Sequence, residues 1–177
     1  MQEHGRDDRE ALFARAVEAH GSAIQRLTRG YERVPALRDE LLQEILLALW
    51  RSLGRFRGDA SLRTWTFRVA HNVATSHVHR AKRRPKWSAE SADEEPAPLH
   101  LLPDTALEHH ERLERLLAAI ETLLPLDRQI ILLYLEELPQ AEIASITGLS
   151  LSNVATRLGR TKRKLAKTLA TPRKETT

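Results

Sequence analysis

The stretch QAEIASITGLSLSNVATRLGRTKRK (residues 140–164) predicts two short helices joined by a tight turn. Helices that cross closely need a small residue at the crossing, a turn residue that tolerates positive φ, and apolar anchors on the second helix. Ala144, Gly148 and Val154 supply these features in that order, and Ser150 is the expected N-cap of the second helix. We therefore expect a helix-turn-helix, a motif common in DNA-binding proteins.

The second helix of this pair has a polar outer face and leads into a run of cations. The residues expected to face outward are Ser152, Asn153, Ala155, Thr156, Gly159 and Arg160. From residue 157 to residue 167 there are six basic side chains and no acidic one. Such a run would neutralise DNA phosphates. A solvated C-terminal helix is the alternative, and the preceding helix pair is what favours DNA binding.

The rest of the chain is also predicted to be helical. Apolar residues recur at helical spacing, and no strand-like alternation of useful length is present. The expected helices span residues 9–27, 37–50 and 62–84 in the first half of the chain, the third capped by Asp59 or Ser61. Those of the second half span residues 106–124, 126–137, 140–147 and 151–169. Pro85 ends the third helix, and Pro125 and Pro139 lie at later joints.

A segment of different composition separates these two groups of helices. Residues 88–104 contain five acids, three prolines and no lysine or arginine, which is typical of a solvated linker. We therefore expect an all-α fold of two small helical domains, at residues 1–87 and 106–170. A flexible acidic linker at 88–105 joins them, and a tail at 171–177 follows.

Composition excludes several classes of protein. The chain has 177 residues, 41% of them hydrophobic, which is enough for one core or two small ones. It contains no cysteine, so thiolate metal sites and disulfide scaffolds are excluded. No secretory signal and no apolar run long enough to span a membrane is present. We expect a cytoplasmic protein with no membrane insertion. The net charge is +4, and the cations are strongly clustered.

Two long segments resemble a known family. Residues 38–80, RDELLQEILLALWRSLGRFRGDASLRTWTFRVAHNVATSHVHR, resemble the second conserved region of extracytoplasmic-function sigma factors. Residues 124–165, LPLDRQIILLYLEELPQAEIASITGLSLSNVATRLGRTKRKL, resemble their fourth region. The FRGDAS-x-x-TW run at 56–65, followed by R-x-A-x-N at 68–72, is the sharpest signal, because general repressors have no counterpart to it.

The resemblance implies a dissociable subunit of bacterial RNA polymerase that directs the core enzyme to promoters in transcription initiation and stress response. It implies no enzyme activity of the chain itself and no cofactor. The implied partners are core RNA polymerase and promoter DNA, and an anti-sigma factor is a further candidate, because many members of the family are held by one.

The resemblance also implies roles for individual residues. The minus-10 element is read by the first domain, where one base is flipped into a pocket near the residue matching Asn72; an amide offers it both a donor and an acceptor. The residues implied for core polymerase binding are Asp39, Glu40, Leu42, Gln43 and Glu44. Those implied for minus-10 DNA are Arg68, His71, Asn72, Arg80 and Arg83. Those implied for minus-35 DNA are Ser152, Asn153, Thr156, Arg157, Arg160 and Arg163.

The chain departs from the family pattern at a few positions. Ala155 and Gly159 stand in the recognition helix where family members often have larger or basic residues. At positions 39 and 40 the family more often has Glu followed by Asp, whereas this chain has Asp39 followed by Glu40. The negative charge is kept and only the side-chain lengths differ. The minus-35 sequence is therefore expected to be unusual, or to be read through DNA shape.

Some residues favour structural interpretations, and two other classes of protein remain open. Trp65 and Phe67 are expected to pack in the core rather than wedge into DNA. His71, His77, His79, His109 and His110 lack the spacing of a metal site, so no metal is expected. The main alternative function is a helix-turn-helix regulator that acts without core polymerase. A recombinase is a further alternative, but no βαβ pattern precedes the linker.

Overall fold

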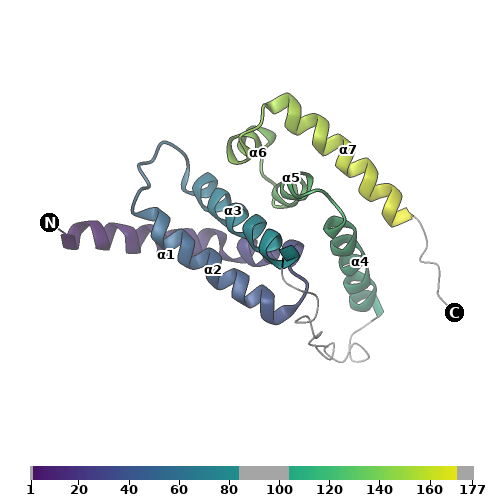
Figure 1. The fold of residues 1–177 in the computed structure, drawn as a ribbon, viewed down its shortest axis with the longest axis horizontal. Helices are drawn as coiled ribbons and strands as arrows, with labels where there is room; N and C mark the ends of the chain where they lie inside the picture. Colours follow the sequence, from purple (N-terminus) through teal and green to yellow (C-terminus); the bar gives the residue numbers. More distant parts are fainter. Residues whose placement is uncertain (1, 84–103, 171–177) are drawn as a thin grey trace.

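The computed structural model describes residues 2–83 and 104–170, with the side chains of residues 7–81 and 106–170. Figure 1 shows the helices in these ranges. The first group comprises α1 (Gln2–Tyr31), α2 (Pro35–Leu53) and α3 (Leu62–Arg83), and the second comprises α4 (Asp104–Glu121), α5 (Pro125–Leu135), α6 (Gln140–Thr147) and α7 (Leu151–Ala170). The described residues form no strand. The all-α expectation is confirmed; most of the expected linker and the tail lie outside the described residues.

Local sequence explains where several helices begin. Pro35 and Pro125 occupy the first turns of α2 and α5, where the missing proline N–H has no intrahelical partner to lose. Ser61, not Asp59, caps α3, because its hydroxyl accepts a hydrogen bond from the backbone N–H of Thr64 at 3.0 Å. Helix α1 is longer than residues 9–27, because the polar residues before Arg9 include good helix formers but no apolar periodicity to mark them.

The three helices of the first domain enclose a core at helical spacing. Leu41, Ile45 and Leu49 recur every fourth residue along α2 and are fully buried. Phe67 is also buried, and Trp65 packs edge-on against Phe56 while its indole N–H donates to the hydroxyl of Ser52 at 3.0 Å. Phe67 and Trp65 are therefore core residues, as the apolar pattern predicted.

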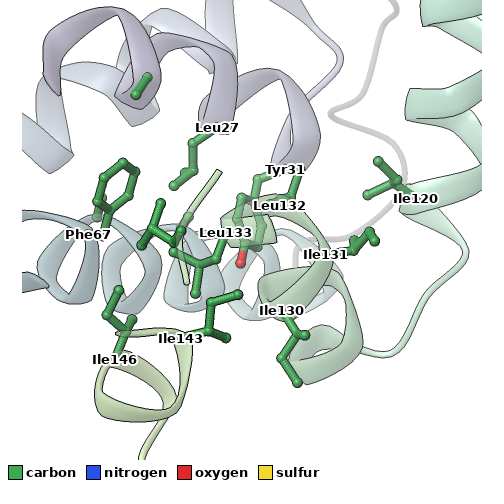
Figure 2. Close-up of a cluster of buried hydrophobic side chains, with 14 of the residues drawn as sticks. Leu27, Tyr31, Phe67, Ile120, Ile130, Ile131, Leu132, Leu133, Ile143 and Ile146 are labelled. Carbon is green, nitrogen blue, oxygen red and sulfur yellow. The ribbon is translucent and has the colours of Figure 1, made fainter. Parts of the chain in front are cut away.

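The two domains are docked against each other, which the sequence did not predict. A single hydrophobic cluster contains residues of both domains: Leu27 and Tyr31 of α1, Phe67 of α3, Ile120 of α4, Ile130, Ile131, Leu132 and Leu133 of α5, and Ile143 and Ile146 of α6 (Figure 2). Helices α4 and α5 contact α1, and α6 contacts α3. Burial of this apolar surface stabilises the docked arrangement.

Candidate nucleic-acid and polymerase interfaces

Helix α2 presents an acidic stripe to solvent. Its buried leucines and isoleucine point into the core, so Asp39, Glu40, Gln43 and Glu44 lie on the opposite, exposed face. Leu42 differs from these four residues, because it is only partly exposed and packs against the main hydrophobic cluster. The structure therefore brings four of the five predicted polymerase-binding side chains together on one exposed surface.

Leu47 belongs to the same stripe and was missed by the sequence reasoning. Its side chain is 48% exposed, and it follows Glu40 and Gln43 at helical spacing, so the three share a face. A single exposed leucine is common on protein surfaces, so Leu47 adds apolar area to the stripe without by itself marking a binding site. Leu47 does not follow the four-residue spacing of the buried residues of α2, and this could have identified it as exposed from the sequence. It was missed because it lies within a run of apolar residues from 45 to 49.

Asn72 lies at an open groove between α2 and α3. Its side chain is exposed, and the groove has a volume of about 370 Å³. The other lining residues are Glu44, Leu47, Ala48, Arg51, Val73, Ser76 and Arg80. An amide at the edge of a groove with charged and apolar walls can hydrogen-bond to the edge of a base that enters it. The groove also adjoins the acidic stripe through Glu44 and Leu47.

His71 is a correction to the sequence prediction. Its side chain is fully buried, and its Nδ1 lies 2.8 Å from the hydroxyl of Tyr31. Burial lowers the pKa of His71 to about 3, so the ring is neutral at neutral pH. His71 precedes Asn72 in the chain, and adjacent residues on a helix point about 100° apart. In this structure His71 is thus a core residue and does not lie on the exposed surface that carries Asn72.

The predicted minus-10 arginines have different surroundings. Arg80 is exposed and pairs with Glu44 of the acidic stripe. Arg68 reaches the second domain, where its guanidinium donates a hydrogen bond of 2.8 Å to the backbone carbonyl of Ser145 on α6. The side chain of Arg83 lies outside the described side chains. Arg68 is therefore engaged by the second domain in the docked form and Arg80 by α2.

Further polar contacts join the domains around Arg68. Glu142 of α6 accepts a hydrogen bond of 2.9 Å from the hydroxyl of Thr64 and lies 3.9 Å from the guanidinium of Arg63. Glu136 forms a two-point ion pair with Arg26 of α1, at 2.9 and 2.6 Å. Because these pairs are partly solvent-exposed, they add less stability than the apolar contact and mainly fix the register of the domains.

The helix-turn-helix has the geometry that its sequence predicted. Gly148 adopts a φ of 72°, in the left-handed region that glycine tolerates. Val154 is fully buried and Ala144 is partly buried at the crossing. The hydroxyl of Ser150 accepts the backbone N–H of Asn153 at 3.3 Å, so it caps α7 as expected. Helix α7 is thereby held on α6 with its polar face outward.

The predicted minus-35 residues divide into small polar side chains at the start of α7 and arginines that have polar partners; of the former, the hydroxyl of Ser152 lies 3.2 Å from that of Ser150. Ser152, Asn153 and Thr156 are exposed at the start of α7. Arg157 and Arg160 both contact Asp127 of α5, at 2.8 and 3.1 Å. Arg163 is exposed and donates to the carbonyl of Gly159 at 3.3 Å. The sequence reasoning missed Asp127, because its place opposite the two arginines depends on how α5 packs on α7.

Three further observations concern an exposed cation on α7, metal binding and membrane spans. Lys162 lies over the ring of Tyr134 at 3.6 Å, a cation–π contact that leaves its ammonium group at the surface. Among the side chains that the structure describes, no group of three or more histidines or carboxylates could hold a metal ion. Within the described helices there is also no segment both long and apolar enough to cross a bilayer.

Comparisons with known families match both domains in order. The family described as Sigma-70 region 2 matches residues 16–84, and the family described as Sigma-70, region 4 matches residues 113–165. The first match contains α2, the groove and α3, and the second contains α5 and the helix-turn-helix. The two matches therefore coincide with the surfaces described above.

Curated relatives point to one group within this family. The chain is 27% identical over 166 residues to the RNA polymerase sigma factor CnrH of Cupriavidus metallidurans, covering 87% of this chain and 84% of that protein. It is 28% identical to the ECF RNA polymerase sigma factor SigM of Mycobacterium tuberculosis, covering 88% of this chain and 70% of that protein. Other relatives match over less of their length: the chain spans 28% of the sigma-H factor of Pseudomonas aeruginosa and 38% of the probable sigma factor RfaY of Xanthomonas campestris.

Solved structures show the same fold. CnrH in complex with the cytosolic domain of CnrY superposes with a TM-score of 0.66 at 23% identity, over 94% of this chain and 93% of that one. The sigma factor RpoE of Bartonella quintana, in complex with the anti-sigma factor NepR, gives a TM-score of 0.68 at 20% identity, over 91% and 98%. With the two family matches and the ECF relatives, the chain belongs to the extracytoplasmic-function group of the sigma-70 family of sigma factors.

Proposed function

We propose that this chain binds core RNA polymerase, recognises promoter DNA with both domains and so directs transcription initiation, without catalysing a reaction itself. The main support is the presence of both sigma regions in order, each with an exposed polar surface of the kind its role needs. A regulator that acts without polymerase gains no support, since both matched families are regions of sigma factors. The cytoplasm is the proposed place of action.

The acidic stripe of α2 is the proposed contact with core polymerase. Asp39, Glu40, Gln43 and Glu44 are exposed there, and the exposed Leu47 adds an apolar contact at the end of the stripe. Acids around an apolar residue suit a basic partner helix, because charge steers the encounter and the leucine becomes buried on binding. Leu42 contributes indirectly by anchoring this stretch of α2 to the core.

The proposed minus-10 site is the groove beside Asn72. We assign base recognition to the amide of Asn72, with Arg80 close by for a phosphate. The proposed minus-35 surface is the exposed start of α7, where Ser152, Asn153 and Thr156 face solvent. Small side chains there leave room for a close approach to base edges in the major groove.

The docked arrangement is proposed to open when the chain binds core polymerase. By their names the two promoter elements lie about 25 base pairs apart, or about 85 Å at about 3.4 Å per base pair. In the docked form α6 contacts α3 directly, and Arg68 donates a hydrogen bond to the backbone carbonyl of Ser145. One chain therefore reaches both elements only when its domains separate, which also frees Arg68 for DNA.

An anti-sigma factor is a proposed further partner. Two solved relatives are complexes of a sigma factor with a second protein, which is the cytosolic domain of CnrY in one and the anti-sigma factor NepR in the other. A partner that favours the docked form would keep the chain inactive, since both DNA-reading domains must separate.

Co-elution with core polymerase tests the proposed function. Purified chain and core enzyme are passed through a gel-filtration column, and the chain alone is mixed with a genomic fragment pool in a gel-shift assay. We expect the chain to co-elute with core and to leave the DNA unshifted when core is absent. A chain that shifts DNA by itself and does not co-elute with core would instead establish the regulator that acts alone.

A further inference from the structure

Asp127 holds two arginines of the recognition helix from a neighbouring helix. Its carboxylate, whose side chain is only 9% exposed, accepts from Arg157 at 2.8 Å and from Arg160 at 3.1 Å. The arginines are three residues apart on α7, so they lie on the same face of that helix. Asp127 lies in the first turn of α5, where the helix dipole also favours a negative charge.

The neighbouring cation does not share this arrangement. Arg128 follows Asp127 in the chain but turns inward, where it donates to the carbonyl of Glu121 and lies over the ring of Tyr31 at 5.8 Å. Among the described side chains, the cations in contact with the Asp127 carboxylate are thus Arg157 and Arg160. A nearly buried carboxylate that orients two DNA-facing arginines is a built feature and not a chance surface pair.

The contacts to Asp127 leave part of each guanidinium available. An arginine has five N–H donors in a rigid fork, and each arginine here presents one terminal nitrogen to the carboxylate. Arg160 remains 61% exposed. An arginine already fixed in place loses less conformational freedom when it meets DNA, and it offers its remaining donors in a defined direction. The carboxylate also lowers the positive charge of the face, which weakens sequence-independent attraction.

We propose that Asp127 is a positioning residue for promoter reading: it orients Arg157 and Arg160, raising discrimination between sequences while lowering sequence-independent attraction to DNA. This inference rests on the proposed function. If the ion pairs of Asp127 only held α5 against α7, their loss would have different effects. It would lower thermal stability and all DNA binding together, and it would leave the relative preference among sequences unchanged.

The test uses holoenzyme assembled from core polymerase and the full chain. The probe is a duplex from a fragment that wild-type holoenzyme transcribes, with its minus-35 window randomised; bound sequences are selected and counted. Binding to one fixed random-sequence duplex is measured against salt. Asp127→Asn should reduce the preference for the selected sequences about tenfold, within the range expected for loss of a well-oriented arginine contact. It should bind the random-sequence duplex as tightly as wild type or more tightly.

Two further variants separate positioning from charge and from folding. Glu137→Gln removes an exposed acid of the same domain that forms no ion pair among the described residues, and it should leave the sequence preference unchanged. Arg160→Lys keeps the charge of an exposed residue and loses the fork, so it should reduce the preference while the salt dependence stays as in wild type. If Asp127→Asn fails to fold, the sequence preference measured for Arg160→Lys decides whether the positioning role stands.

The outcomes distinguish this inference from the proposed function. An unchanged preference in Asp127→Asn or in Arg160→Lys overturns the positioning role, and so does a parallel loss of all binding in a thermally weakened Asp127→Asn. Wild-type holoenzyme that shows no preference at all would contradict the proposed function itself, because no promoter would then be read.

Discussion

Gly30 of α1 lies directly against Leu132 of α5, so closely that a Cβ on Gly30 would fall 2.5 Å from the Cδ2 of Leu132. Leu132 is buried in the cluster that both domains share (Figure 2). The two residues come from different domains, 102 positions apart in the sequence. A side chain at position 30 would therefore require the side chain of Leu132 to shift from its position between the docked domains.

Gly30→Ala should separate the domains. The added methyl group forces Leu132 to shift from a packed position, and such overpacking costs about 1–3 kcal/mol, offset in part by the helix preference of alanine over glycine of about 1 kcal/mol. The chain has no cysteine, so dyes can be attached at Glu18→Cys and Ala166→Cys, which are exposed in the two domains. We expect energy transfer between the dyes to fall in Gly30→Ala.

Gly21→Ala is the matched control for this experiment. It adds the same methyl group to the same helix, where the nearest atom is Cγ1 of Val17 at 3.6 Å, an ordinary contact. Alanine favours a helix over glycine by about 1 kcal/mol, so this variant should gain stability and keep the energy transfer of wild type. Equal energy transfer in both variants would mean that the domains do not depend on this contact.

Glu40→Lys should weaken binding to core polymerase. Glu40 is exposed on the acidic stripe and forms no ion pair among the described side chains, whereas reversal of Glu44 would also leave Arg80 unpaired. A loss of about 1–2 kcal/mol corresponds to roughly five- to 30-fold weaker retention on immobilised core. Glu18 is also exposed and lies on α1, so Glu18→Lys should be retained like wild type. Normal retention of Glu40→Lys would exclude α2 as the polymerase contact.

Asn72→Ala should relax the reading of one position in the minus-10 element. The lost hydrogen bonds are worth about 1–3 kcal/mol at that position, and open-complex formation should decrease accordingly. His79→Ala is the control, because His79 is exposed later on the same helix and does not line the groove. Open-complex yield on promoters varied at each minus-10 position is the measurement. Identical profiles for Asn72→Ala and wild type would contradict the assignment.

Because His71 is buried and neutral, the free energy of unfolding of the chain should decrease in mild acid. Burial lowers its pKa to about 3, whereas the pKa in the unfolded chain is about 6.5. Between these values the unfolded state binds more protons. The free energy of unfolding is therefore highest above about pH 6.5 and falls as the pH drops towards about 3, by about 1.4 kcal/mol per pH unit from this residue.

Urea unfolding of His71→Asn at a series of pH values measures this effect. Asparagine keeps a polar partner for Tyr31 but does not titrate, so the pH dependence should be shallower than in wild type by about 1.4 kcal/mol per unit between about pH 6 and about pH 4.5. His79→Asn, at an exposed position of α3, should retain the slope of wild type. A slope in His71→Asn as steep as in wild type would show that His71 is not held neutral by the fold.

The helices and the turn between α6 and α7 could be predicted from sequence because local rules govern them. Helix α6 has the predicted bounds, and the positive φ of Gly148 and the cap at Ser150 follow from the residue types alone. The exposed polar start of α7 follows from helical spacing once Val154 is recognised as an anchor.

The features that depend on packing between distant helices could not be predicted. His71 adjoins the exposed Asn72 in sequence, and only the position of α1 shows that it faces Tyr31. Asp127 and Arg157 are thirty positions apart, so no local pattern joins them. The docking of the domains depends on apolar residues that, read locally, are assigned to two separate cores.

Transcription from a genomic fragment library with core polymerase tests the central claim most directly. Run-off transcripts are mapped for core alone, for core with the chain, and for core with Asn72→Ala. We predict discrete start sites that depend on the chain and share common minus-35 and minus-10 sequences, with the minus-10 preference relaxed in the variant. A transcript pattern that is the same with and without the chain would contradict the account.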